Sequence, residues 1–451
     1  MSSSESMHGM WSSRLMFILA AAGSAVGLGN IWRFPYVAGE NGGGAFVLVY
    51  LVCIFLIGIP ILMSEVLLGR EGRQSPINTM QVLVERSSAH KLWNVIGWMG
   101  AAAGFMILSF YAVIAGWAMS YVKSLADGTF VAATAEVANN EFNSFVGDPY
   151  QVVMWHGIFM VLTIFIVGRG VSEGLEKAVK YLMPALFFLL LVLVGYSATT
   201  SHFGEGLEFL FSFNVDKLDG NSVLIAMGQA FFTLSLGMGA IMTYGAYMPR
   251  NASIAGSATI IALLDTAVAL LAGMAVFPLV FANGLESSSG PGLMFVTLPL
   301  AFGQMSGGVI FGTLFFLLVT FAAITSAISL MEPALSWLIE HLRVSRVRGA
   351  ILVGGVAWIL GLGSAFSTNI WSELYILPQM TIFDTFDYVS NNIMLPVGGM
   401  LIALFAGWVV DQKVCEEQLQ LSPGQFTIWQ TLVRFVAPAA VGVVFFVTLF
   451  G

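Results

Sequence analysis

Apolar runs of about 20 residues recur from Leu15 to Phe450, and each is long enough to cross a hydrocarbon core of roughly 30 Å as a helix. Only 9% of the 451 residues are charged, whereas a soluble globular protein carries about 25%. So few charges could not keep the surface of a water-soluble domain of this size solvated. The pattern excludes a soluble enzyme, a disordered chain and a nucleic-acid-binding protein. It predicts an all-α polytopic membrane protein that lies in a lipid bilayer.

Hydropathy predicts about eleven transmembrane helices, since a β-barrel would show alternating rather than continuous apolar residues. No linker separates the apolar runs, so residues 1–451 are expected to form a single transmembrane domain. The predicted spans are 12–38, 42–69, 92–126, 150–167, 178–199, 222–248, 256–283, 306–340, 349–366, 386–410 and 427–450.

Charged residues in the loops predict the orientation of these spans. With the N-terminus inside, most Lys and Arg residues fall in inner loops, and the only basic residues of the outer side are Lys123 and Lys217. The outer segment 127–148 is acidic. The positive-inside rule therefore predicts a cytoplasmic N-terminus, an extracytoplasmic C-terminus and a place in the cell (inner) membrane. The apolar start resembles a signal peptide, but its run continues through Gly27 and Asn30, so we interpret it as a span.

Two of the predicted spans are interrupted by small and polar residues. The first is interrupted at 23–30 and the sixth at 235–239, five spans later. An odd offset reverses the orientation, as an inverted-topology repeat would. We therefore expect a 5+5 inverted repeat with broken helices 1 and 6, one repeat over about 12–199 and the other over about 222–410, and an extra helix at about 427–450.

The Gly-rich interruption of the first span allows three interpretations. A dinucleotide-binding loop would follow a β-strand, and this segment lies inside an apolar helix. Small residues also allow close helix packing. The third interpretation is a broken helix whose free carbonyls coordinate a cation and whose second half receives a carboxylate at its N-terminus. Asn30 and Arg33 favour the broken helix, because packing alone needs neither an amide nor a guanidinium there.

Two further groups of residues carry oxygen atoms into apolar spans. Ala322, Thr325 and Ser326 share one helical face, where hydroxyls and a carbonyl suit Na⁺, although hydroxyls also bond back to their own helix. Asp265 lies in the apolar run 260–277, where a carboxylate costs about 2.5–3.5 kcal/mol on insertion scales. We interpret Asp265 as functional, with an unpaired structural carboxylate as the alternative.

The motifs at 24–36, 40–46, 58–65, 228–237 and 322–326 closely resemble those of the neurotransmitter:sodium symporter family, in the family's order. The chain is similar to its prokaryotic members, the bacterial leucine and multi-hydrophobic amino-acid transporters. The resemblance implies a leucine-transporter-like fold. It also implies a sodium-coupled symporter, not an enzyme, that imports an L-amino acid by alternating access.

The resemblance also implies two Na⁺ sites. The first site would comprise Ala25, Asn30, Thr233 and Asp265, and the second Gly23, Val26, Ala322, Thr325 and Ser326. Many animal relatives use chloride to balance the sodium charge. Tyr50 and Gln229 match that chloride pattern, but Ala269 replaces a key serine. We interpret Asp265 as a built-in counter-charge and expect chloride-independent transport.

The resemblance places the substrate beside the first break. Amine transporters of the family carry an Asp where this chain has Gly27, so an amino acid is expected rather than a monoamine. Tyr111 matches the tyrosine that holds the substrate carboxylate, although alone it would pass for a packed aromatic residue. The expected pocket is uncharged and suits hydrophobic or aromatic side chains, because Met238 is flexible and Ala327 is small. Its residues would be Ala25, Gly27, Gly29, Ile107, Tyr111, Phe232, Thr233, Ser235, Met238, Ser326, Ala327 and Leu330.

The family's gates also have counterparts. Arg33 and Asp387 match the outer gate, and Tyr247 and Glu340 match two residues of the inner gate. His8 stands where the family has an Arg, so it is either a pH-sensitive latch or a solvated terminal histidine. Glu65 resembles an acid that supports the broken helices. Gly174 and Pro184 resemble a motif for local unwinding, although a routine helix start is an equal alternative.

Three other functions have weaker support. A transport-deficient amino-acid sensor would use the same scaffold, but no signalling domain is apparent. An ion channel would lack the substrate-coupled shell around Tyr111. A membrane-embedded enzyme would need a metal-ligand cluster or a nucleophile–base pair, and neither is found. No obligate protein partner is evident.

Overall fold

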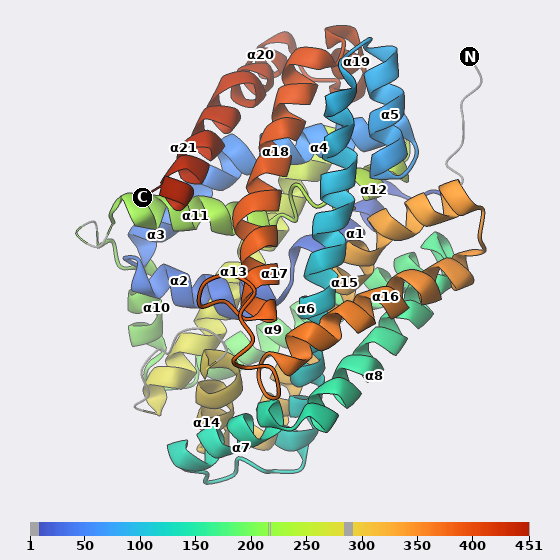
Figure 1. Cartoon of the computed structure of the whole chain (residues 1–451). Coiled ribbons are helices and arrows are strands. Elements are labelled where there is room, and N and C mark those ends of the chain that lie inside the picture. The colour runs from blue at the N-terminus through green and yellow to red at the C-terminus, as the bar shows by residue number, and fades with distance from the viewer. Residues whose placement is uncertain (1–8, 215, 217, 284–291, 451) are drawn as a thin grey trace.

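The computed structural model describes residues 9–214, 216, 218–283 and 292–450. These residues are almost entirely helical, and their only β-type pairings are isolated bridges between Gly43 and Phe213 and between Leu377 and Met380. Figure 1 shows the helices as one bundle of crossing elements without a separate domain. The expected all-α polytopic fold is therefore confirmed.

The first half of the chain contains long helices joined by short turns, and several of them include π-helical or 3₁₀ segments, which are labelled η. Its elements are α1 Arg14–Ala25, η1 Gly29–Arg33, α2 Phe34–Glu40, α3 Gly44–Cys53, η2 Ile54–Gly58, α4 Ile59–Gly72, α5 Pro76–Arg86, η3 Lys91–Asn94, α6 Val95–Ala126, α7 Ala135–Gly147, α8 Pro149–Gly168, η4 Val171–Glu176, α9 Lys177–Ser197 and α10 Phe203–Phe211.

The second half follows the same pattern. Its elements are α11 Gly220–Thr233, α12 Ala240–Ala246, α13 Ile254–Ala282, η6 Leu293–Thr297, α14 Leu298–Gly303, α15 Gly308–Leu342, α16 Arg346–Phe366, α17 Ile382–Tyr388, η7 Val389–Met394, α18 Leu395–Leu404, η8 Phe405–Val409, α19 Gln412–Leu419, α20 Pro423–Thr431, η9 Leu432–Val436 and α21 Ala437–Phe450.

Nine helices of the described chain are long and apolar enough to cross a membrane, and the bent pair formed by 14–25 and 29–40 makes a tenth span. The helix axis bends by 67° between the two parts of this pair. The remaining predicted span is divided into α11 and α12 around residues 234–239. Both interruptions predicted from the sequence are thus real breaks in helices. The fifth span begins earlier than predicted, at Val171, because a π-helical turn continues directly into α9.

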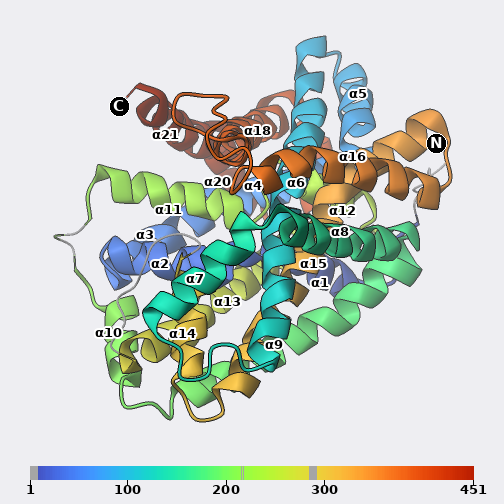
Figure 2. The same ribbon diagram turned by 60° about the horizontal axis from the view of Figure 1, so that its bottom comes forward.

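The long helices α6 and α15 pack against each other at the centre, and α8 packs on α16 at one side (Figure 2). In the most apolar window of α15, 83% of the residues are buried inside the protein, against 22% for the last span, Pro423–Val447. The last span therefore lies at the periphery, where an extra helix outside a repeat would be expected. The repeat itself stays a prediction.

Candidate functional site

The first break lies between α1 and η1. Val26 leaves the helical conformation with ψ 101°, and Asn30 Oδ1, in the next helical segment, accepts the Gly27 N–H at 3.0 Å. A Cβ on Gly27 would lie 2.9 Å from Ser326 Oγ and 3.2 Å from Tyr111 Oη. Only glycine therefore lets the backbone approach these two hydroxyls so closely.

The second break lies between α11 and α12. Ser235, Gly237 and Gly239 all have positive φ angles, between 55° and 79°, so the chain cannot continue as a helix there. The carboxylate of the fully buried Glu65 accepts the Gly237 N–H at 2.6 Å. Glu65 thus holds the broken segment, as expected. The two breaks also meet, because Ser235 Oγ donates to the Ser24 carbonyl at 2.9 Å.

A buried cluster of oxygen atoms joins the first break to α11 and α13. Asn30 Nδ2 donates to Asp265 Oδ1 at 2.7 Å and to Thr233 Oγ1 at 2.8 Å, and Thr233 Oγ1 lies 2.9 Å from Asp265 Oδ2. Tyr50 Oη also donates to Asp265 Oδ2, at 3.4 Å. The structure therefore brings Asn30, Thr233 and Asp265 together, and Ala25 lines the adjacent cavity.

The surroundings of Asp265 suit a cation. Its carboxylate is fully buried, and within the described chain all its hydrogen-bond donors are neutral and it forms no ion pair. A buried carboxylate without a positive partner is unfavourable. The oxygen atoms gathered around Asp265 therefore fit Na⁺, which takes hard oxygen ligands. When bound, Na⁺ would supply the missing positive charge here.

A second group of oxygen atoms lies where α15 meets the first break. Ser326 Oγ is 3.4 Å from the carbonyl oxygens of Gly23 and Val26. Thr325 Oγ1 lies 3.0 Å from the Ala322 carbonyl, so the hydroxyl bonds back to its own helix while its β-carbon lies beside Gly23. The five residues expected at a second Na⁺ site are thus neighbours, and two hydroxyls and three carbonyls fit a hard cation.

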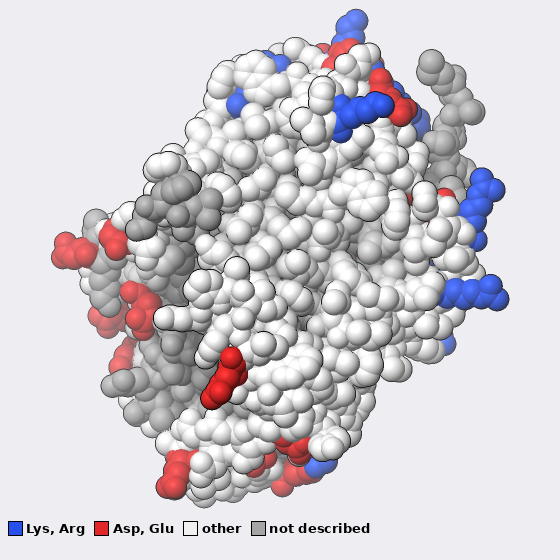
Figure 3. Space-filling view, in the orientation of Figure 1, with Lys and Arg blue, Asp and Glu red and all other residues white. Residues whose placement is uncertain are grey.

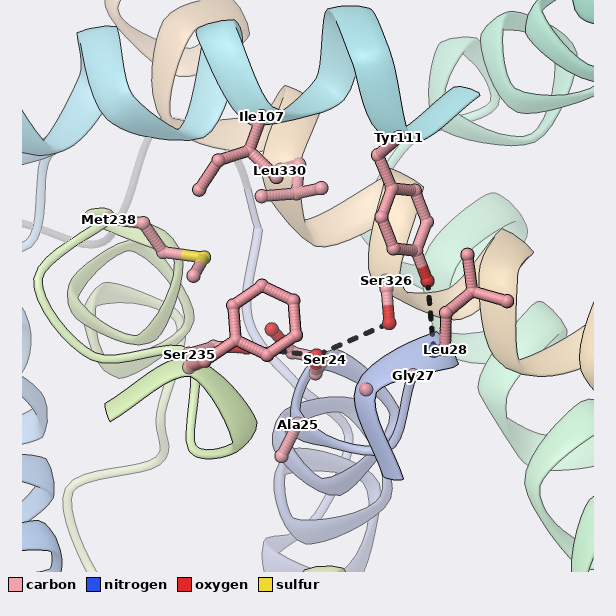
Figure 4. A pocket seen from close by; sticks show the side chains of 12 residues that line it. Ser24, Ala25, Gly27, Leu28, Ile107, Tyr111, Ser235, Met238, Ser326 and Leu330 are labelled. Atoms are coloured by element: carbon pink, nitrogen blue, oxygen red, sulfur yellow. Dashed lines mark hydrogen bonds between the residues drawn. The ribbon is translucent and has the colours of Figure 1, made fainter. Parts of the chain in front are cut away.

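A central cavity of about 30 Å³ lies between the two breaks (Figure 4). In Figure 4, Ile107, Leu330 and Met238 lie on one side of it, and Tyr111 and Ser326 lie on the other. The cavity thus has an apolar end and a hydroxyl-bearing end beside the helix break. Its lining residues are Ser24, Ala25, Gly27, Leu28, Gly29, Ile107, Tyr111, Phe232, Ser235, Met238, Ser326 and Leu330.

This lining overlaps closely with the expected pocket. Thr233 and Ala327 do not line the cavity: Thr233 faces the Asp265 cluster instead, and Ala327 is fully buried. Ser24 and Leu28 do line it, although we did not predict them. Their place next to the break in the first span was the available signal, because residues that flank a break lie beside the opening between the two helical segments.

A larger cavity of about 330 Å³ adjoins the central one and shares Leu28, Gly29, Tyr111 and Phe232 with it. Arg33 and Asp387 both line this outer cavity. The Arg33 guanidinium carbon lies 5.3 Å from the centroid of the Phe232 ring. No ion pair between Arg33 and Asp387 occurs among the described residues, so the predicted gate partners line one cavity without forming a salt bridge.

The opposite end of the broken helices is closed by a buried polar network. Trp11 donates its indole N–H to the Tyr244 carbonyl at 3.1 Å. Tyr247 Oη donates to Glu332 at 2.8 Å, and Glu332 pairs with Arg346 at 2.6 Å. We did not predict roles for Glu332 or Arg346. An acid inside an apolar span, the signal that identified Asp265, was also present at Glu332.

The expected inner-gate residues lie in this region. Glu340 accepts hydrogen bonds from the Ser75 N–H and from Asn78 Nδ2, both at 2.7 Å, at the start of α5. Tyr247 contacts Glu332 as described above. His8 lies outside the described residues.

Comparison with known proteins decides the family. Residues 8–144 and 141–450 match the sequence profile of the Sodium:neurotransmitter symporter family. The chain belongs to this family. It is therefore a multi-pass membrane transporter that uses Na⁺, and not an enzyme.

Relatives of this symporter cover nearly its whole length. The sodium-dependent transporter YhdH of Bacillus subtilis is 37% identical over 96% of each chain, and a sodium-dependent transporter of Methanocaldococcus jannaschii is 31% identical over 97% of this chain and 89% of its own. The crystal structure of MhsT in complex with L-phenylalanine matches with a TM-score of 0.90 and 45% identity, over 97% of this symporter and 99% of MhsT. The leucine-transporter-like fold is thereby confirmed.

Proposed function

We propose that this symporter imports a neutral L-amino acid with a hydrophobic or aromatic side chain, by alternating access. The observation that carries the proposal is the central cavity, where Gly27 leaves space beside the Tyr111 and Ser326 hydroxyls for a substrate carboxylate. No charged side chain lines the cavity, and its other end is apolar. The match to MhsT, which was crystallised with L-phenylalanine, supports this substrate class.

Two Na⁺ ions would bind with the substrate. One would be held by Ala25, Asn30, Thr233 and Asp265, and the other by the oxygen atoms at Gly23, Val26, Ala322, Thr325 and Ser326. The carboxylate of Asp265 would offset the sodium charge, which makes a chloride ion unnecessary. The outer cavity would then close between Arg33 and Asp387 before the cytoplasmic side opens.

The number of ions decides how steeply substrate can be concentrated. Each Na⁺ entering the cell gains about 2.3 kcal/mol per 100 mV of membrane potential, plus about 1.4 kcal/mol for a tenfold concentration gradient. Two ions therefore supply roughly 7 kcal/mol, enough for about a 10⁵-fold substrate gradient. One ion would sustain a gradient of only some hundreds-fold.

Uptake of radiolabelled L-phenylalanine into proteoliposomes under an imposed inward Na⁺ gradient tests the proposal. We expect accumulation above equilibrium that needs Na⁺, continues when chloride is replaced by gluconate, and is competed by leucine, methionine and tryptophan. Saturable binding without accumulation would instead indicate a sensor on the same scaffold. Absence of both binding and uptake for every hydrophobic amino acid would refute the substrate class.

A further inference from the structure

We infer that Asn391 is a positioning residue for the outer gate: it holds the Asp387 carboxylate toward Arg33 and so sets how firmly the outer cavity closes over substrate. The inference rests on the proposed function, because it takes Arg33 and Asp387 as the gate. Asn391 Nδ2 donates to Asp387 Oδ1 at 2.7 Å. Among the described residues, Oδ2 of Asp387 accepts no side-chain hydrogen bond, so this oxygen is available to a guanidinium.

Both gate partners adjoin π-helical turns. Arg33 is the last residue of η1, and Asp387 stands one residue before the end of α17, which continues into η7. A π-turn inserts one residue into a helix and redirects the side chains around it, and such turns occur frequently at functional sites. Asn391 lies inside η7, so the π-turn carries the amide that contacts Asp387.

The stability of the fold does not explain why residue 391 carries an amide. Its Oδ1 is buried and has no hydrogen-bond partner in the described part of the chain. A buried amide with an unsatisfied oxygen is less favourable than an apolar side chain of similar size. The bond to Asp387 is thus the contact that accounts for asparagine at this position.

The other acid on α17 does not compete for the gate. Asp384 forms a capping box with Thr381, whose N–H and hydroxyl it accepts at 3.0 and 2.7 Å. Its carboxylate is therefore occupied at the start of the helix. Asp387 is the acid of this helix that lines the outer cavity.

The test measures how fast radiolabelled L-phenylalanine leaves the purified, Na⁺-saturated protein. We expect Asn391→Leu to release it about three- to tenfold faster, as for the loss of one charge-assisted hydrogen bond, with an unchanged or higher melting temperature. Asn391→Ala serves as a second variant should leucine not fit. Asn392→Ala, on the same π-helical turn, is the matched control and should release at the wild-type rate.

A double-mutant cycle separates positioning from a general effect on the helix. In an Asp387→Asn background, Asn391→Leu should change the release rate by less than twofold. Two outcomes would overturn this inference and leave the proposed function standing. One is that Asn391→Leu accelerates release equally in both backgrounds. The other is that both Asn391 variants release at the wild-type rate while Asp387→Asn releases faster. Wild-type release by Asp387→Asn would show that the proposed outer gate is wrong, and the inference would fall with it.

Discussion

Asp265 is the single residue on which the proposed binding of Na⁺ depends most. Its buried carboxylate is surrounded by neutral donors, so replacing it with a neutral amide should leave the bound Na⁺ without a counter-charge. We expect Asp265→Asn to lower the apparent Na⁺ affinity at least tenfold in chloride-free medium, or to make uptake depend on chloride. Na⁺ titrations of L-phenylalanine uptake with and without chloride measure this. Asp127→Asn, which changes an exposed carboxylate, is the control. Unchanged chloride-free uptake would refute the role.

Gly27 is predicted to control access to the proposed site of the substrate carboxylate. In Gly27→Ala, the added methyl group would meet Ser326 Oγ at 2.9 Å and Tyr111 Oη at 3.2 Å, in the space assigned to the carboxylate. We expect L-phenylalanine binding to weaken at least tenfold, about 1.4 kcal/mol, with little change in melting temperature. Gly195→Ala on α9 is a matched control, because its Cβ would meet no atom within 4 Å. Equal affinities for Gly27→Ala and wild type would place the carboxylate elsewhere.

Among the elements, the helices could be predicted well from hydropathy, and so could the breaks in the first and sixth spans. Clustered Gly, Ser and Asn residues weaken a helix locally, and that signal is present in the sequence itself. The π-helical turns could not be predicted, because they depend on packing against other helices. Partnerships across elements, such as Tyr247 with Glu332, depend on three-dimensional contacts in the same way.

The start of the fifth span offers a test at the scale of one element. Gly174 lies in η4, and Pro184 lies within α9, where it cannot donate a backbone hydrogen bond. If this end unwinds to open the cytoplasmic side, Pro184→Ala should lower the maximal uptake rate several-fold, because it restores a helical bond. Equilibrium L-phenylalanine binding should stay unchanged. An equal loss of binding and uptake, or no loss of either, would favour a routine helix start.

The pair between α15 and α16 is predicted to be structural. Glu332 is fully buried, and its partner Arg346 also donates to the Val167 carbonyl at 2.9 Å, so the pair ties α8 to both helices. Removing one member leaves the other uncompensated, at a cost of about 3–5 kcal/mol. We expect Arg346→Ala to lower the melting temperature clearly, and Arg346→Gln combined with Glu332→Gln to lower it less. A double variant as unstable as Arg346→Ala would show that the charge pair is not the cause.

At the scale of the whole molecule, the charges separate toward opposite ends. In Figure 3, basic side chains gather along the upper and right edges, near α5 and the start of α16, and acidic side chains predominate toward α7 and α10. The broken helices lie between these ends (Figure 1). The positive-inside rule predicts that the basic end faces the cytoplasm, and the outer cavity would then face away from it. With this orientation, substrate that enters through the outer cavity would move toward the cytoplasm, which is the direction of import.

Single-cysteine labelling tests this orientation. Both native cysteines, Cys53 and Cys415, are buried, so an introduced thiol should dominate the labelling. Asn139 on α7 and Glu85 on α5 are both exposed, at opposite ends of the molecule. We expect a membrane-impermeant maleimide to label Asn139→Cys in intact cells and to label Glu85→Cys only after lysis. The reverse pattern would invert the protein, and the cavity lined by Arg33 and Asp387 would then face the cytoplasm.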